Sequence, residues 1–335
     1  MNSNRKKNFF LIIIVVSELT IGFIFLFNFY QQKIVHKVQD PDKIAVIKKE
    51  NLIFPEESEF KYYYELQPNT KAMDEPEWLG YQAKYTYNAD GLNERFNYEV
   101  EKPSNTFRII TLGDSFTYGH YVNTEDNWPE QLEDLLNKPD IKMCNFERIE
   151  VINLSMTGFD IPYLVRRYKD IGAKYQPDLI IWFESGSGFI RLNEFLREGI
   201  NTCEKDENIA YTSEFPTKSH YCWNVAQKKM DEKYSYEEIE QIVTNHLDDF
   251  FSTLIENKVL FFTFNEYDLK DEWKITLEKW KVRYPQASFL SVIPNLHILK
   301  QTLSDGHPNV QGHKTIASSI YKYLENNVIN QCKQK

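Results

Sequence analysis

A serine early in the chain and a histidine near its end are the first candidates for chemistry. Ser115 stands in "TLGDSFTYGH" (111–120), directly after the apolar run 107–112. A serine hydroxyl is a weak nucleophile near neutral pH. It needs a base within hydrogen-bond reach, a group that orients this base, and donors for the oxyanion. The alternative is that Ser115 only caps a helix in an ordinary strand-to-helix turn, and the histidines decide between the two.

Two of the seven histidines lie in "SDGHPNVQGH" (304–313), after the last expected strand and before the last expected helix. Pro308 disfavours helix at His307 and so keeps this imidazole in a loop. Asp305 lies two residues before His307, close enough for its carboxylate to orient one ring nitrogen. We therefore expect Ser115, His307 and Asp305 to form a catalytic triad, which is defined by geometry and not by order along the chain.

Structural roles are expected for two neighbours of these residues. His313 begins the last helix, and packing in the core suits it better than a role as base. Asp114 is expected to brace the turn before Ser115 by accepting hydrogen bonds from backbone N–H groups. Asp305, His307 and His313 are not expected to hold a metal ion, and we expect no cofactor.

Strands and helices alternate along the part of the chain that carries these residues. Short apolar runs at 107–112, 148–154, 177–183, 258–264 and 287–293 predict strands. Helices are predicted at 127–136, 160–175, 235–256 and 310–328, with one more between the last two strands, whereas 184–235 is expected to be irregular. The pattern predicts a three-layer α/β/α sandwich around a mainly parallel five-stranded sheet. Ser115 falls at the carboxyl end of a strand, where such sheets place their sites.

The two motifs together resemble the SGNH, or GDSL-type, hydrolase superfamily, over about residues 107–328. "GDSFTYG" is similar to the first block of the family, which implies a flavodoxin-like SGNH fold with Ser115 as the nucleophile. "DGHPNVQGH" is similar to the last block, which implies His307 as the base. The acid usually stands three residues before the histidine. The two-residue spacing of Asp305 is similar to that of members that move acetyl groups on bacterial exopolysaccharides.

The middle blocks of the family supply the donors for the oxyanion. "NLSMTGFD" is similar to the second block, which implies that the N–H of Gly158 acts beside that of Ser115. The third block normally contains an asparagine but reads "WFESGSGF" here, and Ser187 aligns best with the missing asparagine. Loss of one such donor typically costs about a hundred- to a thousandfold in rate. Either Ser187, Ser185 or Asn193 replaces it, or the enzyme is slow, or catalysis has been lost.

The N-terminal residues differ in composition from the rest. Residues 8–30 are mostly apolar and long enough to span a bilayer as a helix. Three basic residues in the tail 1–7 predict a cytoplasmic N-terminus, with the bulk of the chain outside the cytoplasm. A cleaved signal peptide is the alternative, but its apolar region is usually shorter and followed by small residues. Glu18, within the span, is either protonated or paired with a cation of a polytopic membrane partner.

Residues 31–100 are expected to form a stalk and an aromatic-rich lead-in, packed on a main domain at 101–330 with an insert at about 186–235. "YTYNADGLNERFNYEV" (85–100) alternates around Asp90-Gly91 and predicts a hairpin. The lead-in "YNADGLN" also resembles that of membrane-anchored and exported bacterial members of the superfamily.

The four cysteines are an even number, which permits disulfides in an exported chain. Cys203 and Cys222 are the natural local pair, which leaves Cys144 with Cys332. Four unpaired buried thiols are the alternative. No CxxC spacing indicates a zinc site.

The net charge of −10 argues against nucleic acid as a partner. The sequence therefore predicts an exported, membrane-anchored serine esterase or O-acyltransferase that acts on an ester-bearing substrate, an acylated carbohydrate with O-acetyl groups. The alternative is a degenerate member that binds glycan or organises a polysaccharide assembly complex. Hydrolysis and transfer differ only in whether water or a sugar hydroxyl attacks the acyl-enzyme, which the sequence does not distinguish.

Overall fold

The computed structural model describes residues 52–56, 58–139, 141, 146–189, 191–206, 218–254, 258–265 and 269–329. The chain divides into two compact units, 1–44 and 45–335, and the described residues all belong to the second. The expected anchor at 8–30, with Glu18, lies outside the described residues, as do Cys144 and Cys332. Within the described ranges, no helix is both long and apolar enough to cross a membrane.

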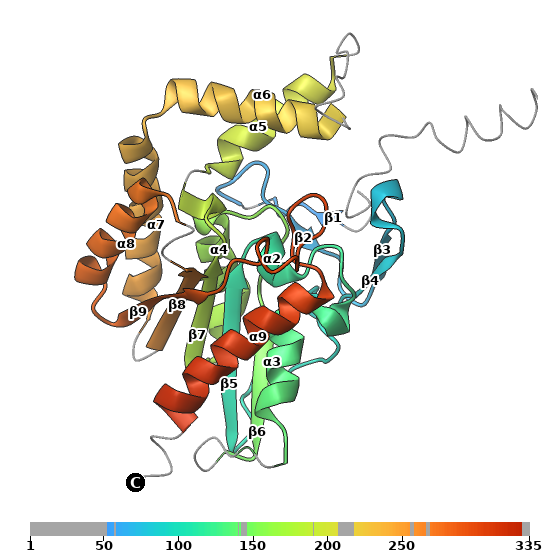
Figure 1. The fold of residues 1–335 in the computed structure, drawn as a ribbon, viewed down its shortest axis with the longest axis vertical. Helices are drawn as coiled ribbons and strands as arrows, with labels where there is room; N and C mark the ends of the chain where they lie inside the picture. Colours follow the sequence, from blue (N-terminus) through green and yellow to red (C-terminus); the bar gives the residue numbers. More distant parts are fainter. Residues whose placement is uncertain are drawn as a thin grey trace, which may run out of the picture. The chain divides into compact units, whose positions relative to one another are not determined.

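A five-stranded parallel sheet organises the second unit (Figure 1). Its strands are β5 (Thr106–Gly113), β6 (Arg148–Asn153), β7 (Leu179–Glu184), β8 (Lys258–Phe264) and β9 (Ala287–Ile293). Their spatial order is β6-β5-β7-β8-β9, and every neighbouring pair is parallel. The expected five-stranded α/β sandwich is thereby confirmed. The chain winds in opposite directions from β5, and ligands bind sheets of this order at such a switch point.

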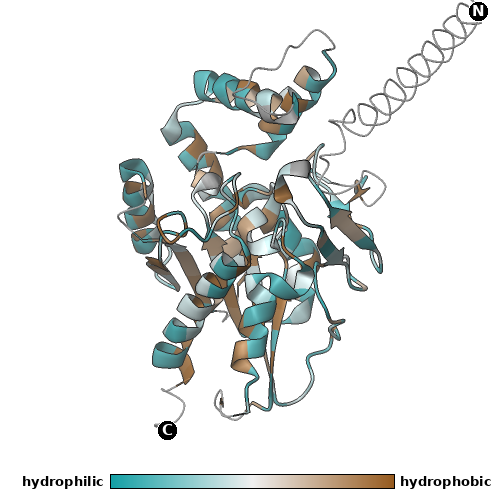
Figure 2. Ribbon diagram, turned by 45° about the vertical axis from the view of Figure 1, so that its right-hand side comes forward, coloured by the Kyte–Doolittle hydropathy of each residue, from teal (hydrophilic) through white to brown (hydrophobic). Residues whose placement is uncertain are grey.

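Side chains of each strand enter two cores, because successive residues point to opposite faces of a sheet. On β7, Ile180 and Trp182 join the core beneath α4 (Ile161–Arg167), α7 (Tyr236–Thr253) and α8 (Asp271–Arg283). Ile181 and Phe183 join the core beneath α3 (Trp128–Leu136) and α9 (Val310–Leu324). Figure 2 shows hydrophobic strands between helices with hydrophilic outer faces. Because helices cover both faces of the sheet, its strands are held in place, and so are the points at which they end.

Short helical segments complete the connections: η3 (Glu77–Leu79), α2 (Ser115–Tyr118), η4 (Thr124–Asp126), η5 (Tyr168–Gly172), η6 (Ala173–Tyr175), η7 (Ser187–Phe189) and η9 (Glu325–Ile329).

The lead-in forms two small antiparallel pairs, β1 (Leu52–Ile53) with β2 (Glu65–Leu66), and β3 (Lys71–Asp74) with β4 (Ala83–Thr86). The hairpin predicted within 85–100 is present in a short form: an antiparallel bridge joins Tyr87 to Asn93 across the Asp90-Gly91 turn, and the Glu94 N–H donates to the Thr86 carbonyl at 3.1 Å. The longer pairing of β4 is with the preceding β3. The side chain of Asn88 accepts from the N–H groups of Asp90 and Leu92, which favours a compact turn over a second strand.

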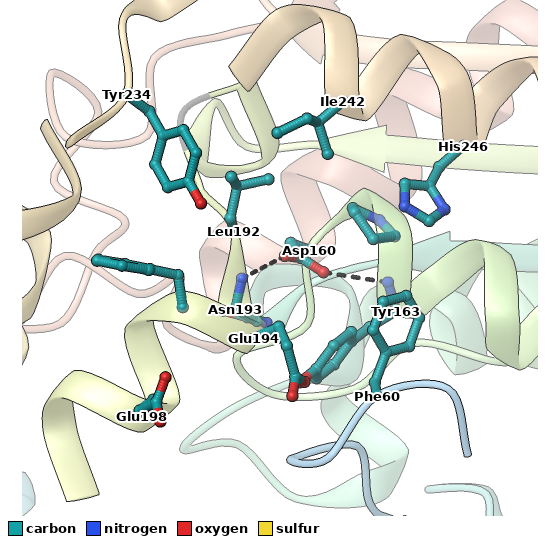
Figure 3. Close-up of a pocket in the computed structure, with 12 residues that line it drawn as sticks. Phe60, Asp160, Tyr163, Leu192, Asn193, Glu194, Glu198, Tyr234, Ile242 and His246 are labelled. Atoms are coloured by element: carbon teal, nitrogen blue, oxygen red, sulfur yellow. Dashed lines mark hydrogen bonds between the residues drawn. The ribbon is translucent and has the colours of Figure 1, made fainter. Parts of the chain in front are cut away.

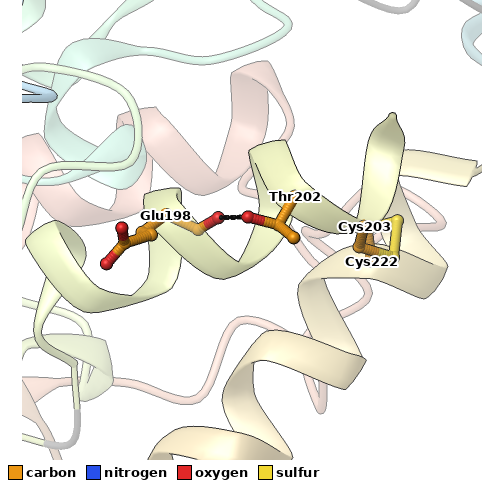
Figure 4. Close-up of a disulfide and its surroundings, with 4 residues drawn as sticks. All are labelled: Glu198, Thr202, Cys203 and Cys222. Atoms are coloured by element: carbon orange, nitrogen blue, oxygen red, sulfur yellow. Dashed lines mark hydrogen bonds between the residues drawn. A yellow bond between two sulfur atoms is a disulfide. The ribbon is translucent and has the colours of Figure 1, made fainter. Parts of the chain in front are cut away.

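The stretch 184–235 contains two helices, α5 (Asn193–Glu204) and α6 (Lys218–Lys233), so the prediction of an irregular stretch was wrong. Cys222, Ala226 and Met230 recur every fourth residue of α6, and all three are fully buried. That spacing is a helix signal, which the polar and aromatic residues between them obscured. A disulfide joins Cys203 on α5 to Cys222 on α6, with Cα atoms 5.5 Å apart (Figure 4). The predicted local pairing of Cys203 with Cys222 is therefore present.

Candidate active site

Ser115 is the first residue of α2, immediately beyond β5. Asp114 caps this helix, and its Oδ1 accepts from the N–H of Phe116 at 2.9 Å, as the sequence predicted. Gly113 permits the abrupt change of direction, because a Cβ there would stand 2.7 Å from the carbonyl oxygen of Phe183. The N–H groups of the first turn of a helix have no helical acceptor, so that of Ser115 is available to a ligand.

His307 and Asp305 lie in the loop between β9 and α9. This loop folds back on itself, with a bridge between Thr302 and Pro308 and a hydrogen bond of 2.7 Å from Leu303 N to His307 O. Asp305 Oδ2 lies 2.7 Å from His307 Nδ1, and Asp305 Oδ1 accepts from the His307 N–H at 3.1 Å. His307 Nε2 lies 2.9 Å from Ser115 Oγ. The three residues that the sequence singled out therefore form one hydrogen-bonded chain.

The protonation states of this chain follow from its geometry. Burial acts to raise the pKa of Asp305, but the hydrogen bond to His307 and the charge of His307 outweigh it and hold the pKa below its ordinary value. An ionised Asp305 can only accept, so Nδ1 of His307 carries the proton that it donates. Nε2 is then the acceptor for the Ser115 hydroxyl, as a general base must be.

Three rings surround His307. The ring centroids of Phe116, His120 and Tyr121 lie 5.3, 4.8 and 5.6 Å from that of His307. His120 is 3% exposed, and burial, joined by the charge of His307, lowers the pKa of His120 well below its usual range. Its Nδ1 lies 3.4 Å from Oγ1 of Thr157. No role was predicted for His120; its position five residues after Ser115 was the only signal.

Gly158 follows Thr157 in the loop that leads into α4. Its φ of +71° lies in the left-handed region that favours glycine. Its carbonyl oxygen accepts from Nδ2 of Asn193. Asp160 accepts from the N–H of Asn193 at 2.6 Å and from that of Tyr163 at 3.1 Å. Asn193 therefore holds the Gly158 loop, and its amide is already engaged there.

The loop after β7 carries the sequence "ESGSGF" (184–189), which was compared with the third block above. Glu184 Oε1 accepts from the N–H groups of Gly186 at 2.9 Å and Gly188 at 2.8 Å. Burial, and then the charge of Asp114, raises the pKa of Glu184 to about 8. The hydroxyl of Ser185 donates to Asp114 Oδ2 at 2.6 Å. Ser185 therefore braces the turn before Ser115, whereas the side chain of Ser187 lies outside the described part.

His313 lies apart from this chemistry, as expected. It is fully buried in α9, and its Nδ1 accepts from the N–H of Trp128 at 3.2 Å. Burial lowers the pKa of His313 to about 3. Among the described residues, no group of three histidine, cysteine, aspartate or glutamate side chains could hold a metal ion.

A cavity of about 270 Å³ adjoins the Gly158 loop (Figure 3). Asp160 and Asn193 line it, together with aromatic and acidic side chains, among them Phe60, Tyr163, Tyr234, Glu194 and Glu198. Ser115 and His307 are not among its lining residues. The cavity therefore shares the residues that hold the Gly158 loop but does not contain the hydrogen-bonded chain.

Solved structures with similar coordinates are lipases and esterases of low sequence identity. The lipase/acylhydrolase from Enterococcus faecalis is 14% identical, with a TM-score of 0.39, over 66% of this chain and 97% of that one. A catalytic mutant of an acetylxylan esterase from Geobacillus stearothermophilus is 15% identical, with a TM-score of 0.38, over 65% and 94%. A two-domain esterase active on acetylated mannans is 17% identical, with a TM-score of 0.40, over 66% and 50%. No family model and no curated protein matches the chain.

Proposed function

We propose that the protein is a serine esterase or O-acyltransferase of the SGNH type, and that Ser115, His307 and Asp305 are its catalytic triad. One observation carries the proposal: Ser115 Oγ lies 2.9 Å from His307 Nε2, and His307 Nδ1 lies 2.7 Å from Asp305. A mere helix cap would not require this base and this orienting acid at hydrogen-bond distance. The sequence blocks around Ser115 and His307 support the same assignment.

The mechanism follows from this chain of hydrogen bonds. Ser115 Oγ attacks the acyl carbonyl carbon while its proton passes to His307 Nε2, and Asp305 stabilises the imidazolium that results. The N–H groups of Ser115 and Gly158 stabilise the oxyanion of the tetrahedral intermediate. As the intermediate collapses, His307 returns the proton to the leaving alcohol, and the acyl group remains on Ser115. Water or a second hydroxyl then attacks the acyl-enzyme, and His307 takes the proton of this new nucleophile.

The substrate that we propose is an O-acetylated surface glycan. The spacing of Asp305 and His307, similar to that of members that act on exopolysaccharides, supports this substrate class. Incubation of the protein with an acetyl donor and an oligosaccharide acceptor separates the two outcomes. An acetylated oligosaccharide would identify a transferase, and free acetate alone would identify a hydrolase.

Labelling with a fluorophosphonate probe tests the nucleophile directly. Ser115 should be labelled in the wild-type protein, and neither Ser115→Ala nor His307→Ala should be labelled. Both variants should abolish turnover of 4-nitrophenyl acetate while the far-UV circular dichroism stays unchanged. Their effects should not add in the double variant, because the two residues act as one unit. If the wild-type protein is neither labelled nor active, the enzyme hypothesis fails. The alternative, a protein that binds glycan or organises an assembly complex, then takes its place.

We also propose that residues 8–30 anchor the protein in the membrane and that the domain from 101 to 330 lies outside the cytoplasm. The basic tail 1–7 supports this orientation, and the disulfide between Cys203 and Cys222 suits an oxidising compartment. Protease added to intact cells, or to spheroplasts where an outer membrane is present, should digest the domain. A domain that is protected in intact cells or spheroplasts but digested after lysis would refute the orientation.

A further inference from the structure

Two arginine side chains of the insert converge on the Gly158 loop. Arg197 on α5 places Nη2 2.7 Å from the point where a Cβ on Gly158 would stand. The guanidinium groups of Arg191 and Arg197 lie 4.9 and 6.0 Å from the ring centroid of Trp223 on α6. Arg197 also lies 5.8 Å from the ring centroid of Tyr64. At these distances both cations are within the range of cation–π attraction to the rings.

Within the described residues, neither cation has the acidic partner that arginines usually have. No ion pair joins either guanidinium to a carboxylate there, and Nε of Arg197 is buried without a hydrogen-bond partner. Burial lowers the pKa of Arg191, and the nearby carboxyls of Asp114, Glu184 and Asp160 oppose this effect without outweighing it. These carboxyls accept hydrogen bonds from backbone N–H groups and from Ser185. A desolvated cation without a partner is costly, and an anion between the two groups would remove this cost.

The arginines lie close to the proposed reaction. Thr157, next to Gly158, contacts His120, whose ring lies 4.8 Å from that of His307. The disulfide holds Trp223 near α5, because the preceding residue, Cys222, is bonded to Cys203 of α5. Arg197 is therefore held in place from α5, from α6 and against the residue that we propose as an oxyanion donor.

We propose that Arg191 and Arg197 bind an oxyanion of the substrate, a carboxylate or a phosphate, close to the ester that Ser115 attacks. The substrate is then an acidic glycan and not a neutral one, an inference that rests on the proposed function. Guanidinium groups suit this role because their planar edges match carboxylate and phosphate oxygens in pairs.

Three acetyl esters test the proposal: O-acetylated xylotriose, which is neutral, O-acetylated trigalacturonate, which carries carboxylates, and O-acetyl glycerol phosphate. Hydrogen bonds to charged groups are worth about 1.5–3 kcal/mol, so kcat/KM for one of the anionic esters should exceed that for the neutral sugar ester by about tenfold or more. The better anionic ester then identifies the group. Arg197→Gln and Arg191→Gln should each reduce this preference about tenfold, again from the strength of one charged hydrogen bond.

Arg148→Gln is the matched control. Arg148 begins β6, at the end of the strand away from the Gly158 loop, and its side chain is half-exposed, so the charge preference should stay at its wild-type value. Should the arginine variants not fold, the wild-type preference is measured in rising salt, where an ionic contact weakens. A neutral sugar ester cleaved as fast as both anionic esters, with no effect of salt or of either arginine variant, would overturn the proposal.

A binding measurement distinguishes failure of the anion site from failure of the proposed esterase function. Calorimetry on the Ser115→Ala protein compares trigalacturonate and glycerol phosphate with xylotriose, without any turnover. Binding of an anion but not of xylotriose supports the arginine site even if the protein proves catalytically inert. Turnover of 4-nitrophenyl acetate and labelling of Ser115, together with no binding preference, would leave the esterase intact and remove only the anion site.

Discussion

The imidazole of His120 lies beside that of His307, with ring centroids 4.8 Å apart, and it is buried where it cannot hold a charge. A neutral ring matters at this position. His307 must become positive when Ser115 gives up its proton, and a second cation beside it would oppose that step. His120 therefore fills the space next to the base without opposing its protonation, and it connects the base to Thr157 of the oxyanion loop.

Two substitutions separate these functions of His120. His120→Phe keeps a ring against His307 but loses the contact with Thr157, and kcat/KM should fall by up to about tenfold, the worth of one neutral hydrogen bond. His120→Lys introduces a charge beside the base and should cost more. Kinetics with 4-nitrophenyl acetate measure both, and circular dichroism controls for folding. Equal losses in the two variants would show that charge at this position is immaterial.

Gly158 and Gly80 form a matched pair, with φ of +71° and +73°. An alanine at either position pays the strain of the left-handed region, about 1–2 kcal/mol of unfolding free energy. A Cβ on Gly80 meets nothing within 4 Å, whereas one on Gly158 meets Arg197. Gly158→Ala keeps the N–H but places a Cβ against Arg197, so the loop should be displaced and kcat/KM should fall by up to about a hundredfold, the worth of one displaced oxyanion donor, whereas Gly80→Ala should not affect it. Equal activities of the two folded variants would show that the Gly158 loop tolerates this Cβ without loss of function.

Glu184 should make the stability of the protein depend on pH. Its pKa in the folded protein is about 8 against an ordinary 4.5, so between these values the folded state retains a proton that the unfolded state releases. The unfolding free energy should therefore fall as pH rises through this window, and the stabilisation should be complete only below pH 4.5. Glu184→Gln, which does not titrate, should show a shallower fall in urea unfolding at pH 5, 7 and 9. The exposed Glu147→Gln should keep the wild-type slope, and an unchanged slope in Glu184→Gln would contradict the assignment.

The disulfide should contribute measurably to stability. Its cysteines are 19 residues apart, and closing a loop of this size stabilises a folded chain by about 3 kcal/mol. The double variant Cys203→Ser/Cys222→Ser should have an unfolding free energy lower by about that amount, measured with denaturant. Reductant should not lower it further. Fluorophosphonate labelling of Ser115 should survive, because the triad comes from other elements. Wild-type stability that is the same with and without reductant would show that the loop is restrained by other contacts.

Ser187→Asn addresses the missing third donor. Under the proposed function, the substitution supplies at position 187 the amide that SGNH hydrolases usually have in the oxyanion hole, so the rate with 4-nitrophenyl acetate should rise or stay the same. Ser185→Asn is the informative comparison, because it removes the hydroxyl that donates to Asp114 and should lower the rate. A gain in Ser185→Asn together with a loss in Ser187→Asn would exchange the roles of the two serines.

The sheet and the hydrogen-bonded chain of Ser115, His307 and Asp305 were predictable for different reasons. Each strand is a short, nearly continuous apolar run, so its own residues indicate that both of its faces are buried. Ser115 and His307 each carry a motif that identifies them without the rest of the fold. The helices of the insert were less visible, because few buried residues, such as Ala226 and Met230, mark α6 among polar neighbours.

Contacts between distant loops were not predictable from the sequence. Asn193 was considered as an oxyanion donor, but whether its amide reaches the site or the Gly158 carbonyl depends on where α5 begins relative to α4. The same holds for His120, whose role is set by a loop that follows β9. Arg197 belongs to no motif, and its importance arises only because α5 crosses the Gly158 loop.

Ser115 and His307, the proposed nucleophile and base, are 192 residues apart in the chain. A polypeptide that is still emerging from the ribosome, or one truncated before the last strand and helix, therefore holds Ser115 without a proton acceptor. Such a chain has no means to attack esters, whatever the state of its earlier elements. Esterase activity would accordingly serve as a sensor of completed synthesis and folding, and it should appear late, together with the docking of α9.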